Sequence, residues 1–75
     1  MKFRDRMIDA MKEHARGHIA KHKMNVEVYF RNAAGIGGDV NADILEEIEK
    51  ELDIVARYDD QLAMLDKYFP EDING

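Results

Sequence analysis

The charges of this 75-residue chain are divided unevenly between its two halves, and the division falls at a glycine-rich segment. Residues 1–31 carry eight Lys and Arg against four Asp and Glu, a net charge of +4, whereas residues 32–75 carry three against twelve, a net charge of −9. Oppositely charged halves of similar length attract each other if the chain turns back between them. Residues 33–39 supply three glycines for such a turn. The pattern predicts a hairpin of two antiparallel segments.

The first half has the apolar spacing of an amphipathic helix. Apolar and aromatic residues recur there at steps of three and four, at Ile8, Met11, Ala15, His18, His22, Val26 and Tyr29. This spacing predicts a helix over about residues 2–32. Residues 26–30 have a composition that also suits a strand, but a single strand would have no partner, so helix is predicted there too. Gly35 is expected to end the helix.

The second half shows the pattern of an amphipathic helix more clearly, over about residues 42–69. Its apolar positions are Leu45, Ile48, Leu52, Val55, Tyr58, Leu62, Leu65 and Phe69. Asn41 is the expected N-cap, and Pro70 cannot continue the helix. The turn then covers about residues 33–41, and a frayed tail covers 70–75. The sequence therefore predicts one all-α domain over residues 1–75, a long antiparallel helical hairpin.

If the turn is centred near residues 36–38, facing residues have numbers that sum to roughly 74, because both arms rise equally. This rule predicts three cross-helix ion pairs, namely Lys21 with Asp53, Lys23 with Glu51, and Arg16 with Asp59. Exposed pairs of this kind contribute about 0–1 kcal/mol each, so they are expected to set register more than stability.

Two helices alone make a thin core, and the chain has no Cys to cross-link it. Ile44, Ile54 and Met64 widen the apolar surface of the second helix beyond what one partner helix covers. Together with Leu52 and Val55 they predict an interface with a second copy. The expected assembly is a homodimeric four-helix bundle.

Several classes of function are disfavoured. No apolar run is long enough for a signal peptide core or a membrane span, which favours a soluble protein of the cytoplasm with no membrane partner. The net charge of −5 disfavours nucleic acid as the partner. The glycines at 35–38 lack the strands that a dinucleotide fingerprint requires. Asp59 and Asp60 point about 100° apart, and two helices leave no substrate pocket, so we expect neither an enzyme nor a bound cofactor.

Three histidines, His14, His18 and His22, follow one another at four-residue steps. Two histidines four residues apart have metal-ligand spacing, and Asp59 and Asp60 would lie near His14 and His18 by the facing rule. A metal-binding helical bundle using these residues is therefore the alternative function. The simpler interpretation needs no metal, because His18 and His22 fit the edge of the helix contact beside acidic groups and His14 fits a solvated position.

Residues 25–29, 34–37, 43–62 and 65–69 carry a resemblance to small uncharacterised proteins of large tailed phages that infect marine cyanobacteria. The likeness covers about residues 14–69, with a longer stretch here at 38–42. It implies a phage origin and the cytoplasm of the host cell, but no activity and no functional residues. We therefore expect a small oligomeric helical protein that acts through protein–protein contacts. Its expected partners are a second copy of the chain and a host or phage protein. Its expected role is accessory, host-modulating or a minor part in assembly.

Overall fold

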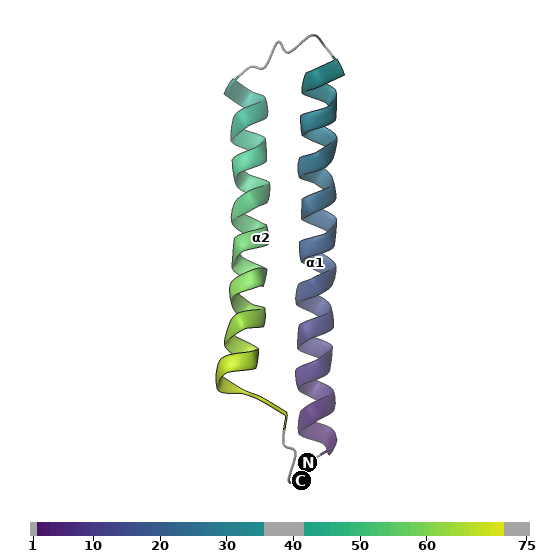
Figure 1. Cartoon of the computed structure of the whole chain (residues 1–75), viewed down its shortest axis with the longest axis vertical. Coiled ribbons are helices and arrows are strands. Elements are labelled where there is room, and N and C mark those ends of the chain that lie inside the picture. Colours follow the sequence, from purple (N-terminus) through teal and green to yellow (C-terminus); the bar gives the residue numbers. More distant parts are fainter. Residues whose placement is uncertain (1, 36–41, 72–75) are drawn as a thin grey trace.

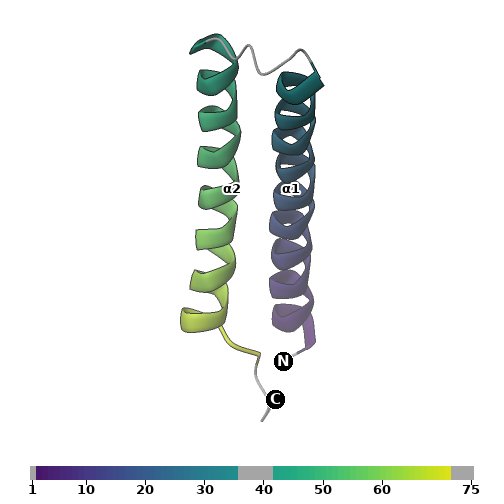
Figure 2. The ribbon, with the colours of Figure 1, turned by 45° about the horizontal axis from the view of Figure 1, so that its top comes forward.

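The computed structural model describes residues 2–35 and 42–71, and it contains two α-helices, α1 (Lys2–Gly35) and α2 (Ala42–Tyr68). The helices lie side by side and run in opposite directions (Figure 1). The same arrangement is visible after rotation of the view (Figure 2), and the molecule is a rod of 57 × 16 × 13 Å. No strand occurs among the described residues. The prediction of an all-α helical hairpin is confirmed.

The helix boundaries lie close to those predicted. Residues 26–30 are helical, and α1 continues three residues past the expected end to finish at Gly35. The N-cap predicted at Asn41 and the centre of the turn lie outside the described residues. α2 ends at Tyr68, one residue earlier than expected, with the Phe69 N–H donating to the Leu65 carbonyl at 3.0 Å.

The segment after α2 turns back toward the start of α1 (Figure 1). There, Arg4 Nη1 donates a hydrogen bond to the Pro70 carbonyl oxygen at 3.0 Å. Proline cannot continue the helix, so the chain leaves α2 at this point. The contact ties the open end of the hairpin together across the two helices.

The contact between the helices follows a regular alternation of three- and four-residue steps, the spacing of coiled coils. We call this contact the seam. Its buried residues are Ile8, Ala15, Val26 and Ile48. Its half-buried positions are Lys12, Ile19, His22 and Tyr29 on α1 and Ile44, Glu51, Val55, Tyr58, Leu62 and Leu65 on α2. Ala15 is fully buried, so the helices approach closely at its level.

The seam differs in part from the predicted apolar stripes. Met11, Leu45 and Leu52 were expected in the contact, but their side chains are 50%, 57% and 50% exposed. Ile44 and Ile54, expected to lie off the stripe, are half-buried. The strict alternation puts Glu51 in the seam beside Leu52, and Glu51 is tolerated there because it is hydrogen-bonded across the helices.

The facing rule predicts the relative register of the two helices correctly, but the three ion pairs that it predicted are wrong. Cross-helix polar contacts join residues whose numbers sum to between 73 and 78. None of the three expected pairs is among the ion pairs of the described residues. Lys12 pairs with Asp66 at 2.9 Å, and Arg16 pairs instead with Glu13 of its own helix at 3.0 Å. Long Lys and Arg side chains can reach several carboxylates, so the position of a residue along the helix does not determine which carboxylate it pairs with.

Candidate functional site

The three histidines form a continuous cluster along one side of α1. The ring centres of His14 and His18 lie 4.6 Å apart, and the rings of His18 and His22 are stacked at 5.9 Å. Tyr58 of α2 stacks on His18 with ring centres 4.4 Å apart and also meets His14 edge-on at 5.9 Å. The four-residue step of the helix places the imidazoles one turn apart. Tyr58 then fixes the orientation of His18 from the other helix.

The innermost histidine belongs to a polar layer across the seam. His22 Nδ1 donates to Glu51 Oε2, and Asn25 Nδ2 donates to the same oxygen at 3.3 Å. The side chains of His22 and Glu51 are only 13% and 17% exposed. The hydrogen bonds, that from His22 first, hold the pKa of Glu51 below its usual 4.5 although partial burial opposes this. A satisfied polar layer inside an apolar contact fixes the register of the two helices.

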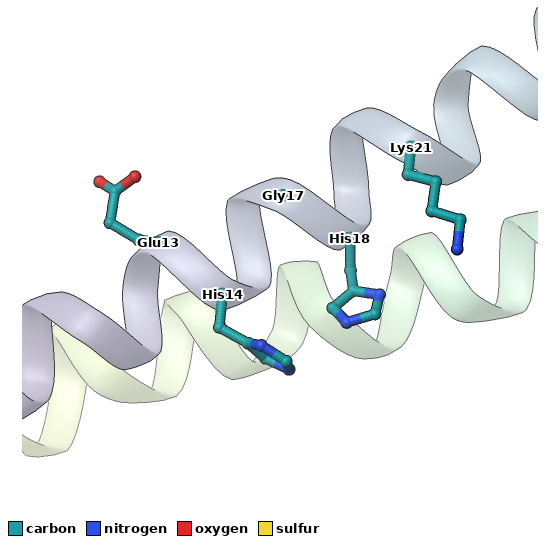
Figure 3. Close-up of a pocket in the computed structure, with 5 residues that line it drawn as sticks. All are labelled: Glu13, His14, Gly17, His18 and Lys21. Atoms are coloured by element: carbon teal, nitrogen blue, oxygen red, sulfur yellow. The ribbon is translucent and has the colours of Figure 1, made fainter.

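The outer part of the cluster opens onto a shallow hollow on the surface. Glu13, His14, Gly17, His18 and Lys21 line it. His14 and His18 point toward α2, whereas the Glu13 carboxylate points away from it (Figure 3). A methyl group placed on Gly17 would meet nothing within 4 Å. The helix backbone is therefore open to approach from outside at this level.

Loss of water around the ring lowers the pKa of His18 below its usual value of 6.5. Repulsion from three neighbouring basic groups lowers this pKa further, those of His14, His22 and Lys21. The folded chain therefore holds the proton of His18 less tightly than the unfolded chain does.

We expect the free energy of unfolding to fall as the pH is lowered below about 6.5, because the unfolded chain then binds more protons than the folded one. Urea unfolding at pH 7.5, 6.5 and 5.5 with chelator present measures this dependence. The variant His18→Gln should flatten it. Protonation of Glu51 also lowers the free energy of unfolding, but only below its usual pKa of 4.5, outside the pH range of these measurements. An equal slope in the variant would contradict the assignment to His18.

A second feature is an apolar groove near the open end of the hairpin. It is lined by Met11 of α1, by Gln61, Met64 and Leu65 of α2, and by Phe69, which directly follows α2. Met11, Met64 and Phe69 are each about half exposed. Met7, one turn before Met11, is 58% exposed, and Tyr68, one turn after Met64, is 61% exposed. Large apolar side chains thus gather on one side of both helices.

The structure brings together some of the predicted site residues and separates others. His14 and His18 are in contact, but Asp59 and Asp60 are exposed, and no three His, Asp or Glu side chains of the described segments gather as metal ligands. Of the predicted interface residues, Ile44, Ile54 and Val55 are half-buried, whereas Leu52 and Met64 expose about half of their surface. The glycines at 37 and 38 lie outside the described residues.

Sequence reasoning missed Glu51 as the partner of His22. The signal was present, because the numbers 22 and 51 nearly satisfy the facing rule, but Glu51 was assigned to Lys23. It was also missed that Tyr58 stacks on the histidines, since Tyr58 was counted as an apolar seam residue alone.

No protein-family model matches the chain, and the searches of curated proteins and of solved structures also gave no match. Within the described segments, no helix is both long and apolar enough to cross a bilayer. The surface of the hairpin itself is therefore the guide to its function.

Proposed function

We propose that this hairpin acts through protein–protein contacts and that its first partner is a second copy of itself, in a dimeric four-helix bundle. The observation that carries the proposal is the amount of exposed surface. The hairpin exposes 5902 Å², whereas a compact monomer of 8.7 kDa exposes about 4,700 Å². Much of the surplus is apolar, because eleven large apolar side chains among the described residues are about half exposed or more. Where such side chains gather, as Met11, Met64 and Phe69 do around the groove, they mark an interaction site.

The area fits a stable dimer. A compact protein of twice this mass exposes about 7,900 Å², so two hairpins would bury roughly 4,000 Å² on forming one. Obligate homodimers bury about 2,000–5,000 Å² in total. The chain has no Cys, and only four apolar residues of the described segments are buried, so dimerisation is the most direct way to gain the missing core.

One side of the hairpin suits this contact better than the other. We call it the methionine flank, and it comprises Met7, Met11, His14, His18 and Val28 of α1 with Ile54, Gln61, Met64 and Tyr68 of α2, while Lys21, Lys50 and Arg57 follow in the same seven-residue register. The opposite side, the charged flank, presents Asp9, Arg16, Lys23, Asp59 and Asp66 together with Leu45 and Leu52. Charged residues are depleted at the centres of interfaces. The methionine flank is therefore the proposed surface, with Ile54 and Met64 within it.

The biological role that we propose is an accessory one, either modulation of a host or phage protein or a minor part in assembly. It is supported by the uncommitted apolar surface and by the resemblance to small phage proteins. The alternative function is the binding of a metal ion, and it is supported by a different observation, the contact between His14 and His18.

The dependence of melting on protein concentration tests self-association. A dimer whose folding and association are linked melts at a higher temperature when the concentration is raised a hundredfold, because mass action favours the associated state. A melting temperature that stays constant over this range would remove the second copy as partner and leave the methionine flank for a different protein.

A further inference from the structure

A second apolar patch lies on the charged flank, at the end of the hairpin where α1 finishes and α2 begins (Figure 1). Leu45 and Leu52 are seven residues apart on α2, and their side chains are 57% and 50% exposed. Phe30 of α1 is 52% exposed and follows Lys23 of the charged flank by seven residues, so it lies on that flank too. The numbers of Phe30 and Leu45 also satisfy the facing rule, so the two residues lie at the same level of the hairpin. We call Phe30, Leu45 and Leu52 the leucine patch.

Exposed carboxylates surround the leucine patch. On the outer side of α2 they are Glu46, Glu49, Asp53 and Asp59, and α1 adds Glu27. None of these five carboxylates forms a hydrogen bond or a salt bridge with another described residue. The cations of the same stretch of α2, Lys50 and Arg57, belong to the register of the methionine flank instead. Lys23 and Arg31 of α1 offset only part of the negative charge.

The spacing and the charge of this surface fit a basic amphipathic helix. Helices that dock on a protein surface present apolar side chains at steps that include seven residues, which is the spacing of Leu45 and Leu52. Lys or Arg beside those apolar side chains would pair with the unpaired carboxylates. Nucleic acid and anionic membranes are negatively charged, so this surface repels them. Charge complementarity therefore selects a cationic helix as the partner.

We propose that the leucine patch and the carboxylates around it bind an amphipathic helix of a different protein. The bound helix carries leucine-like side chains along one face and Lys or Arg on both sides of that face. This inference goes beyond the proposed self-association, because the patch lies on the opposite side of the hairpin from the methionine flank. The patch therefore stays exposed in a dimer formed through that flank, and each chain binds one helix.

Titration of the full chain with a fluorescently labelled, helical peptide of leucine and lysine, followed by fluorescence anisotropy, tests the proposal. We expect one peptide per chain and an affinity that falls as salt is added. The same peptide with glutamate in place of lysine should not bind. Leu52→Lys should lower the affinity at least about tenfold and keep the dimer, because it places an ammonium group against the apolar face of the peptide. Met64→Lys is the matched control, which should lose the dimer and keep the peptide.

The carboxylates are tested separately. Glu49→Gln combined with Asp53→Asn should weaken binding about two- to tenfold, because two exposed ion pairs with the peptide are lost. Asp9→Asn combined with Glu71→Gln removes the same charge at the open end of the hairpin and should leave the affinity unchanged.

The outcomes separate this proposal from the proposed dimer. Equal weakening by the two pairs of substitutions would show that the peptide responds only to the overall negative charge, which overturns the leucine patch as its site. A lower mass for Leu52→Lys than for the unaltered chain, measured without peptide, would show that a second copy covers the patch and would also overturn the proposal. A monomer that still binds the peptide and loses it in Leu52→Lys would overturn the dimer alone.

Discussion

Replacing Ile48 by alanine will lower the free energy of unfolding by about 2–4 kcal/mol, because the deleted atoms leave a cavity in the seam. Ile48 is 7% exposed and is the most buried side chain described in α2. A domain of this size is stabilised by about 4–11 kcal/mol in total, so the change removes a large part of it. Urea unfolding at one protein concentration measures the loss.

Leu45→Ala is the matched control for this variant. Leu45 is one turn away on the same helix and belonged to the apolar stripe predicted from the sequence, but it is 57% exposed on the charged flank. Its replacement should cost less than about 1 kcal/mol. Equal losses in the two variants would mean that the seam follows the predicted stripe rather than the alternation that buries Ile48.

Replacing Met64 by lysine will separate the proposed dimer. Met64 lines the apolar groove together with Met11 and is 48% exposed in the single hairpin, so the hairpin itself tolerates lysine there. In the dimer the same ammonium group would be buried against apolar side chains. An ammonium group buried without a partner costs several kcal/mol, and a loss of about 2 kcal/mol already weakens association about thirtyfold.

Leu52→Lys serves as the control for Met64→Lys. Leu52 is on the same helix and is exposed to the same extent, 50%, but it lies on the charged flank. Size-exclusion chromatography with light scattering should show a dimer for Leu52→Lys and a monomer for Met64→Lys. A dimer lost equally in both variants would show that the methionine flank is not the contact surface.

The helices themselves were predictable because their signals are local. The steps of three and four, Gly35 and Pro70 were sufficient to predict two helices with ends within three residues of those observed. The choice of seam was harder. Leu45 and Ile48 fit the same helical face by spacing, and only the contact with the other helix, through pairs such as His22 with Glu51, decides which one is buried.

The candidate site was predictable in its residues but not in its partners. The four-residue step indicates that His14 and His18 are neighbours, and the structure confirms this contact. It does not indicate that Tyr58 covers His18 or that Asp59 and Asp60 stay exposed beside them. Both facts depend on how α2 is rotated about its own axis. A rotation of about 50° would change which residues of α2 face the histidines, but the spacing of the apolar residues along the sequence would be the same.

Sedimentation equilibrium of the unaltered chain over a wide range of concentrations, with EDTA present, tests the central claim of self-association most directly. If the chain dimerises, the measured average mass will approach twice the chain's 8.7 kDa as the concentration rises. A mass of 8.7 kDa at every concentration would contradict it.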